Sequence, residues 1–238
     1  MRSRNALVTG GSRGIGRAVV EQLTKNGHRV YAMSRTPPED LPKGADFVSC
    51  DLTVADSLVE CLRGLDPIDI LVNNAGDVIS QPIEKIELSE WERHFAINST
   101  APFICIRELI SGMRERSWGR IVTVASTAAL EGTPYVASYT ASKHSLIGLM
   151  RVLALELGES GVTANTVCPT YVRTEMISEA LRNIVRLTGA TTEEAEARLR
   201  SQTPGGRIIE VEEVSKVVVD LIDGGENGLE VLLDGRNS

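Results

Sequence analysis

The sequence is poor in the residues that build disulfide frameworks and metal sites. It contains four cysteines and three histidines in 238 residues. The cysteines are widely spaced, with no Cys-x-x-Cys pair, which favours free thiols in a reducing compartment. The histidines form no His-x-x-x-His or His/Cys cluster, so the sequence predicts no metal site.

An excess of positive charge and long apolar runs are also missing. The formal net charge is −7, whereas nucleic acids and anionic membranes favour an excess of Lys and Arg. The longest apolar runs fall far short of the ~20 residues that a membrane span needs. The first residues, MRSRNALVTG, contain no apolar signal-peptide segment. We therefore expect a cytoplasmic protein that binds neither nucleic acid nor membrane.

Strand-like and helix-like segments alternate along the whole chain. Short apolar runs predict strands over 6–10, 28–34, 45–50, 68–76, 119–126, 161–168 and 229–233. Several runs are continuous rather than alternating, which is typical of parallel strands buried on both faces. Amphipathic patterns predict a helix directly after the first strand and further helices over 53–64, 88–117, 139–159 and 211–223. No linker or repeat interrupts this order, so we predict one α/β domain over 1–238, a doubly wound parallel sheet of about seven strands with helices on both faces.

Residues 174–207 depart from the alternating pattern. They contain two polar helical segments, and the pairs Glu194/Arg198 and Glu196/Arg200 have the i,i+4 spacing that supports an exposed helix. An insertion at this point can close over a substrate cleft. The sequence leaves two interpretations open: a substrate lid, or a solvated helical excursion.

The first predicted strand runs into VTGGSRGIG, residues 8–16, with four glycines in nine positions. Glycine permits positive φ and lets the backbone approach a ligand without a side chain. The helix that follows presents free N–H groups and the positive end of its dipole, both of which favour phosphate. Gly10, Gly14 and Gly16 therefore predict a dinucleotide pyrophosphate site, and a tight turn without a ligand is the alternative.

Two arginines stand where a cofactor 2′-phosphate would lie. Arg13 is inside the glycine-rich turn, and Arg35 closes the second predicted strand. NAD-binding proteins often place a carboxylate at that strand end, whereas Ser34 and Arg35 occupy it here. Because a guanidinium binds oxyanions bidentately, the pair predicts NADP(H). Ordinary surface arginines are the alternative.

Four polar residues form a candidate catalytic set. Tyr139 and Lys143 are four positions apart at a predicted helix start, and so share one face. Ser126 ends the fifth predicted strand, and ligand sites in open α/β sheets collect at such ends. Asn98 lies within the predicted helix 88–117, although asparagine is a poor helix former.

In these motifs the sequence resembles the short-chain dehydrogenase/reductase family. The motifs occur together and in order: TGxxxGxG (9–16), Asp51, NNAG (73–76), Asn98, Ser126 and Tyr139-x-x-x-Lys143. Together they span nearly the whole chain, and the resemblance is strongest to 3-oxoacyl-thioester reductases and polyketide ketoreductases. It implies a single Rossmann-fold domain that binds NADP(H).

The resemblance also assigns the catalytic roles. Tyr139 would donate a proton to the alkoxide that hydride transfer leaves on a ketone, and the Lys143 ammonium would lower the pKa of its phenol. Lys143 would also hold the nicotinamide ribose. Ser126 would hydrogen-bond the carbonyl oxygen, and Asn98 would hold a water in a proton relay.

The same resemblance implies a cofactor-binding set. Asp51 would contact the adenine, Asn73 and Gly76 would lie beside the adenosine ribose, and Thr174 would contact the nicotinamide carboxamide or a phosphate. The complete predicted set is Thr9, Gly10, Ser12, Arg13, Gly14, Ile15, Gly16, Arg35, Asp51, Leu52, Asn74, Ala75, Gly76, Tyr139, Lys143, Pro169, Val172 and Thr174.

The sequence departs from the family pattern at two places. Thr170 replaces the glycine that usually follows the proline after the sixth strand, and with Tyr171 it is expected to reshape the nicotinamide pocket. Arg236 replaces the second glycine of a C-terminal turn. Since family members often assemble through that region and two long helices, we expect a homo-dimer or homo-tetramer.

We predict an NADPH-dependent carbonyl reductase acting on a 3-oxoacyl thioester or polyketide-like ketone. Arg173, Arg182 and Arg207 are candidates for meeting the phosphate of a thioester carrier, and scattered surface charges are the alternative. A dehydrogenase that oxidises a cyclic or steroid-like alcohol would use the same residues. A non-catalytic NADP-binding sensor is a third hypothesis, which the presence of both Tyr139 and Lys143 disfavours.

Overall fold

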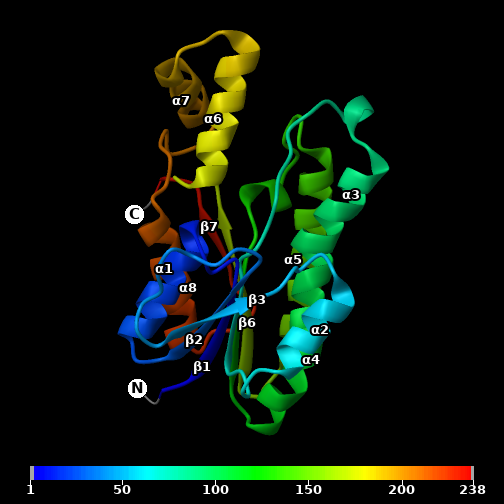
Figure 1. Cartoon of the computed structure of the whole chain (residues 1–238), viewed down its shortest axis with the longest axis vertical. Coiled ribbons are helices and arrows are strands. Elements are labelled where there is room, and N and C mark those ends of the chain that lie inside the picture. Colours follow the sequence, from blue (N-terminus) through cyan, green and yellow to red (C-terminus); the bar gives the residue numbers. More distant parts are fainter. Residues whose placement is uncertain (1–2, 237–238) are drawn as a thin grey trace.

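The computed structural model describes residues 3–236. Its centre is one parallel sheet with the strand order β3-β2-β1-β4-β5-β6-β7 (Figure 1). The strands are β1 (Asn5–Thr9), β2 (Arg29–Ser34), β3 (Ala45–Ser49), β4 (Ile70–Asn73), β5 (Gly119–Val124), β6 (Val162–Pro169) and β7 (Glu230–Leu233). All seven predicted strands are present, with ends that differ by a few residues, and the predicted α/β class is confirmed.

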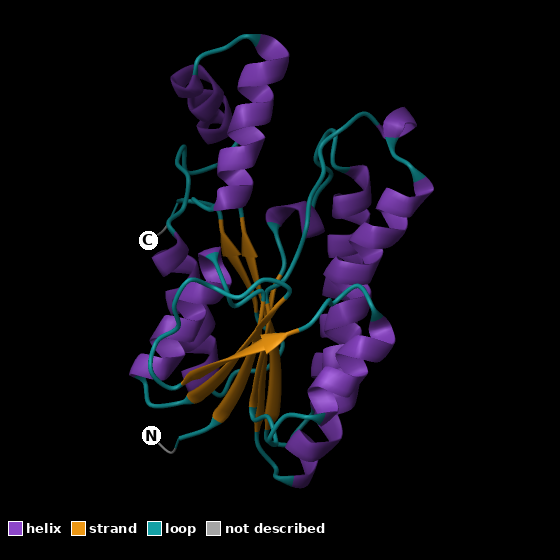
Figure 2. Ribbon diagram, in the orientation of Figure 1, coloured by secondary structure: helices purple, strands orange, loops and turns teal. Residues whose placement is uncertain are grey.

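Two layers of helices cover the sheet (Figure 2). Helices α1 (Gly14–Lys25) and α8 (Val211–Asp223) lie on one face, and α2 (Ala55–Arg63), α4 (Ala101–Glu115) and α5 (Ala137–Leu157) lie on the other. Successive strand residues point to opposite faces. Thus Ala6 and Val8 belong to the apolar cluster under α1 and α8, whereas Leu7 belongs to the other cluster. This two-sided burial explains the continuous apolar runs in the sequence.

The predicted helix 88–117 is interrupted in its middle. Its first part is α3 (Leu88–Phe95), its last part is α4, and a π-helical segment (Ala96–Thr100) connects them. Pro102 has no N–H to donate to the carbonyl of Asn98, four residues earlier, so regular α-helical bonding cannot continue across this point. The prediction of one regular helix was therefore wrong, and the irregular segment contains Asn98.

The strand order changes direction beside β1. This strand pairs with β2 on one side and β4 on the other, so the chain crosses to the opposite half of the sheet after β3. Such a switch point leaves a crevice at the carboxyl ends of the strands, where α/β proteins bind ligands. The turns that follow β1 and β4 lie there.

The segment 174–207 forms two helices, α6 (Glu175–Thr188) and α7 (Thr192–Ser201), as the sequence predicted. They stand beyond the carboxyl ends of the strands, at the top of Figure 1. Leu181, Ala195 and Leu199 form a small apolar cluster between them. None of the helices within residues 3–236 has the length and apolar character of a membrane-spanning segment.

Candidate active site

The glycine-rich turn after β1 depends on glycine at three positions. Gly10 and Gly14 have φ values of +67° and +55°, which side chains rarely tolerate. A Cβ atom on Gly16 would lie 2.3 Å from the carbonyl oxygen of Gly10. Only glycine therefore lets α1 begin so close to the end of β1, as the sequence analysis predicted.

The first turn of α1 fits a phosphate group. Its N-cap residue, Arg13, makes no side-chain capping bond, so the N–H groups of this turn depend on another partner. A Cβ on Gly14 would lie 3.4 Å from Cγ2 of Thr174. The space between the turn and Thr174 thus stays open only because residue 14 is glycine, and this arrangement suits the pyrophosphate of a dinucleotide.

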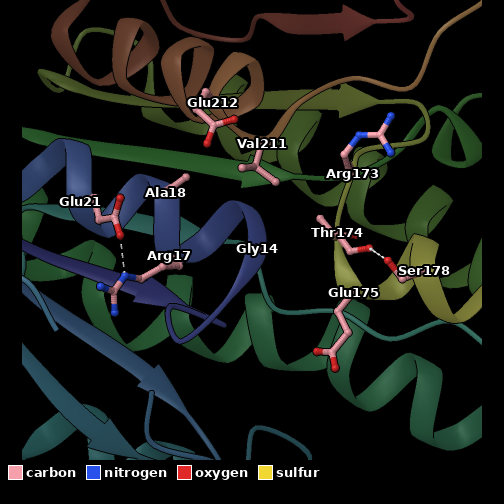
Figure 3. Close-up of a pocket in the computed structure, with 10 residues that line it drawn as sticks. All are labelled: Gly14, Arg17, Ala18, Glu21, Arg173, Thr174, Glu175, Ser178, Val211 and Glu212. Atoms are coloured by element: carbon pink, nitrogen blue, oxygen red, sulfur yellow. Dashed lines mark hydrogen bonds and ion pairs between the residues drawn. The ribbon is translucent and has the colours of Figure 1, made fainter. Parts of the chain in front are cut away.

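A cavity of about 370 Å³ lies on the outer side of this turn. Figure 3 shows the residues that line it. Gly14, Arg17 and Glu21 of α1 line one side, and residues from the starts of α6 and α8 line the other. Both of its arginines are already paired: Arg17 with Glu21 at 2.8 Å, and Arg173 with Glu210 at 3.0 Å. The cavity meets the candidate site only at Gly14 and Thr174.

Thr9 and Asn74 join the two turns at the switch point. The hydroxyl of Thr9 accepts hydrogen bonds from the backbone N–H groups of Asn74 (3.0 Å) and Ala75 (3.1 Å). The Asn74 amide in turn donates to the Thr9 carbonyl oxygen at 3.0 Å. Thr9 is only 3% exposed. Its side chain therefore holds the turns together, a role that the predicted cofactor contact did not include.

The NNAG segment divides into a buried and an open part. Asn73 is buried within β4, and its amide faces Thr123 of β5 at 3.5 Å. The expectation that Asn73 lies beside a ribose is therefore corrected, because the side chain points into the sheet. A Cβ on Gly76 would lie 2.9 Å from Oδ1 of Asn98 and 3.5 Å from Nζ of Lys143. Gly76 thus lies at the point where two predicted catalytic residues meet.

The two arginines predicted to share a 2′-phosphate have different surroundings. Arg13 forms an exposed ion pair with Glu175, the first residue of α6. Arg35 follows β2, is exposed, and forms no ion pair with the residues that the structure describes. It lies close enough to Asp51 to help lower the pKa of that carboxyl, although hydrogen bonds from Thr53 contribute more. Arg13 is therefore held in an ion pair, whereas Arg35 forms none among the described residues.

Asp51 has a local structural role that the sequence left open. Its Oδ1 accepts hydrogen bonds from the N–H (2.9 Å) and the hydroxyl (2.7 Å) of Thr53. These bonds fix the turn between β3 and α2. Leu52 is buried beside it.

Asn98 is fully buried in the π-helical segment. Its Oδ1 accepts from the N–H of Asp77 at 3.0 Å, and its Nδ2 donates to the carbonyl oxygen of Asp77 (3.0 Å) and to Oγ of Ser142 (3.1 Å). Asn98 therefore ties the chain after β4 to α5. Asp77 and Ser142 were not predicted. Ser142 could have been found, since it follows Tyr139 by three residues on the same helix face.

Tyr139, Lys143 and Ser126 come together between α5 and the end of β5. Nζ of Lys143 lies 5.8 Å from the centre of the Tyr139 ring and donates to the carbonyl oxygen of Val124 at 3.0 Å. Ser126 precedes a short 3₁₀ turn, and its hydroxyl accepts from the N–H of Ala128 at 3.1 Å. The structure thus brings together residues from two separate segments of the sequence, α5 and the end of β5.

The ionisation of this group differs from the expectation. Burial raises the pKa of Tyr139, and a hydrogen bond with Ser126 opposes this in part. Burial also lowers the pKa of Lys143 to about 8. The pKa of Tyr139 is therefore shifted upward by burial, whereas we had expected Lys143 to lower it. A protonated phenol is the form that donates a proton.

The segment after β6 accommodates its non-glycine residues. Thr170 adopts a negative φ, and its N–H donates to the carbonyl oxygen of Leu233 at 2.8 Å. Tyr171 packs against the apolar cluster of α6 and α7, and its hydroxyl donates to Gln202 at 2.8 Å. Tyr171 therefore belongs to the insertion, which corrects its expected place in the nicotinamide pocket. Pro169 ends β6, and Val172 is buried.

The arginines proposed for a carrier phosphate are mostly engaged. Arg173 contacts Glu210 and Glu196, and Arg207 forms a two-pronged pair with Glu213 at 2.8 and 2.5 Å. These contacts are consistent with the surface-charge alternative for both residues.

Comparisons with known proteins cover the whole site. Residues 4–184 match the short chain dehydrogenase family. The chain is 32% identical to the D-beta-hydroxybutyrate dehydrogenase of Rhizobium meliloti (strain 1021), over 98% of both chains. It is 34% identical to the acetoacetyl-CoA reductase of the same organism, over 92% of this chain and 90% of the relative.

A similar solved structure is that of the actinorhodin polyketide ketoreductase with NADPH. It is 30% identical in sequence and superposes with a TM-score of 0.89, covering 99% of this chain and 98% of the other. The similarity includes both the glycine-rich turn and the segment that contains α6 and α7.

Proposed function

Because the chain belongs to the short-chain dehydrogenase family, we propose that it is an NADPH-dependent reductase of 3-oxoacyl thioesters or polyketide-like ketones. The coarser part of the prediction, an oxidoreductase acting on hydroxyl or keto groups, is confirmed by the family and its relatives. No observation favours the non-catalytic sensor.

The observation that supports the proposal best is the buried group of Tyr139, Lys143 and Ser126. NADPH would supply the hydride to the keto carbon. Ser126 would donate a hydrogen bond to the keto oxygen and stabilise the developing negative charge. Tyr139, whose pKa is raised by burial, would donate its proton to the same oxygen.

Lys143 and Asn98 would support this proton donor. The Lys143 ammonium lies beside the Tyr139 ring and close to Gly76. From this position it would hold the ribose hydroxyls of the cofactor while it stays near the phenol of Tyr139. The side chain of Asn98 also lies next to Gly76, on which a Cβ atom would approach both Asn98 and Lys143. This placement supports the relay expected from Asn98 towards Lys143, in which a proton returns to Tyr139.

The preference for NADPH is supported by charge at the end of β2. Arg35 is exposed and unpaired among the described residues, and the adjacent Ser34 supplies no carboxylate to repel a 2′-phosphate. A relative solved with NADPH adds support. Arg13 can join Arg35 only after leaving Glu175.

The substrate class is inferred from what the relatives share. One is named for acetoacetyl-CoA and another for beta-hydroxybutyrate, so both act at the third carbon of a four-carbon acyl chain. The hydroxybutyrate relative favours a second candidate function, oxidation of a secondary alcohol by the same residues.

We also propose that 174–207 is a lid and that the protein is a cytoplasmic homo-oligomer. The start of α6 meets the phosphate-binding turn through Thr174 and Glu175, so movement of this segment would open the cofactor site.

Large apolar side chains are exposed on α5, with Leu155 83% and Val152 54% exposed, which a second subunit would cover. Four free cysteines suit a reducing compartment.

The test is NADPH consumption with acetoacetyl-CoA, longer 3-oxoacyl thioesters and cyclic ketones. Tyr139→Phe should lower kcat by about 10²-fold or more while NADPH still binds. Tyr135→Phe, at a 64% exposed tyrosine, is the matched control and should retain activity. Equal turnover by wild type and Tyr139→Phe would refute the proposed mechanism.

A further inference from the structure

His94 is a buried polar residue that no motif explains. It lies on α3, is fully buried, and its Nδ1 is hydrogen-bonded to Oγ of Ser138 at 2.7 Å. Ser138 is also fully buried and immediately precedes Tyr139 on α5. The other ring nitrogen, Nε2, has no partner among the described residues. A buried imidazole with one unpaired nitrogen is costly, so an apolar residue would serve better if packing were the only role.

His94 makes one of three side-chain hydrogen bonds that join α5 to α3 and the π-helical segment; the others are Asn98–Ser142 and Ser145–Ser99. His94 and Asn98 are four residues apart, and so are their partners Ser138 and Ser142. Residues at this spacing share a helix face. The His94 and Asn98 contacts, at 2.7 and 3.1 Å, therefore bracket Tyr139. The Asn98 contact belongs to the motif, whereas the His94 contact lies outside it.

We propose that His94 is a positioning residue for the proton donor: its bond to Ser138 fixes the first turn of α5 and thereby the place of the Tyr139 hydroxyl. The inference rests on the proposed function. The N-cap residue of α5, Val136, makes no side-chain capping bond, so the hydrogen bond between His94 and Ser138 restrains a first turn that has no cap of its own. A proton donor must lie within hydrogen-bond distance of the reacting oxygen, so a small displacement lowers the rate.

Burial keeps the His94 imidazole neutral despite the charged residues around it. Asp77 and Glu90 favour its protonated form and Arg93 opposes it, but burial has the largest effect and lowers its pKa. A neutral imidazole can bond to the Ser138 hydroxyl in either tautomer, as acceptor or as donor. The contact is therefore expected to persist across the neutral pH range.

The experiment compares Ser138→Ala, His94→Leu, His94→Asn and the double variant His94→Leu/Ser138→Ala. We expect Ser138→Ala and His94→Leu each to lower kcat by roughly 10-fold, with KM and the NADPH Kd within about twofold of wild type. The double variant should lose no more than either single variant, because both remove one contact. His94→Asn should recover most of kcat, since its amide can take the place of Nδ1.

Ser215→Ala is the matched control. Ser215 is fully buried on α8 and accepts a hydrogen bond of the same length, 2.7 Å, from Gln22 of α1. Loss of this hydrogen bond in Ser215→Ala should lower Tm about as much as Ser138→Ala does, but kcat should stay unchanged. If His94→Leu fails to fold, the inference is tested by comparing the kcat and Tm of Ser138→Ala with those of Ser215→Ala.

Three outcomes would overturn the inference. The first is an unchanged kcat in Ser138→Ala with a Tm loss equal to that of Ser215→Ala, which would make the contact purely stabilising. The second is additive loss of kcat in the double variant. The third is a wild type without Tyr139-dependent turnover, which would instead refute the proposed function on which the inference rests. The first two leave the proposed function intact.

Discussion

Replacing Lys143 by methionine measures the cost of burying an ammonium beside Tyr139. Lys143 is 4% exposed, and burial lowers its pKa from 10.5 to about 8. Each pKa unit corresponds to about 1.4 kcal/mol, so the protonated side chain destabilises the folded state by about 3 kcal/mol at neutral pH. Losing the hydrogen bond to Val124 offsets about 1 kcal/mol. We expect the variant to be inactive but more stable by about 2 kcal/mol.

The stability that Lys143→Met gains over wild type should become smaller as the pH rises. Below about pH 8, Lys143 is protonated in both the folded and the unfolded protein, and the penalty of burial is complete. Between about pH 8 and 10.5 the unfolded chain binds more protons than the folded protein, so wild-type stability rises relative to the variant. The advantage of Lys143→Met should therefore disappear by about pH 10.5.

Urea unfolding and thermal unfolding of both proteins at pH 7, 9 and 10 test this prediction. At pH 7 the Tm of Lys143→Met should exceed that of wild type by about 5 °C. Lys216→Met is the control, because Lys216 is an exposed residue paired with Asp220 and should show no comparable gain. A variant that is no more stable at pH 7, or a gain that is the same at pH 7 and 10, would refute the reasoning.

Three further predictions concern the cofactor site. Gly16→Ala should destabilise the protein by about 1–3 kcal/mol and weaken NADPH binding in a fluorescence titration, because its Cβ meets the Gly10 carbonyl; an unaltered Tm would contradict this. Glu175→Gln should release Arg13 and strengthen NADP⁺ binding severalfold, about 1 kcal/mol, over NAD⁺. Glu179→Gln on the same helix is its control, and equal effects on both cofactors would count against it. Arg35→Asp should lower the preference for NADPH over NADH, in kcat/KM, at least about 10-fold; an unchanged ratio would exclude Arg35 as its source.

Much of the fold could be predicted because its signals are local. A buried parallel strand needs a continuous apolar run, and a covering helix needs an apolar stripe, so both patterns are visible in short windows of sequence. The interruption at residues 96–100 was missed although Pro102 was visible, because a helix pattern of apolar residues continues through it. Only the packing of α3 and α4 against α5 shows how the chain absorbs the missing hydrogen bond.

The catalytic set was accessible from sequence because its members belong to short motifs. Tyr139 and Lys143 are one helical turn apart, and the glycines of residues 10–16 are required by backbone geometry that no other residue satisfies. These motifs carry the family resemblance, and the resemblance implied the class of chemistry before any contact was known. The side chains of Thr9 and Asn73 were harder to assign, because a motif does not say whether a polar group faces a ligand or the interior.

What the sequence alone determined is the order of the elements and the chemical groups available. What the tertiary structure decided is which groups are close together and how they ionise. His94 and Ser138 are 44 residues apart in the chain, and Arg13 and Glu175 are 162 apart, so no local pattern could pair them. The pKa values of Tyr139 and Lys143 were likewise shifted by burial, which exists only after the chain has folded around them.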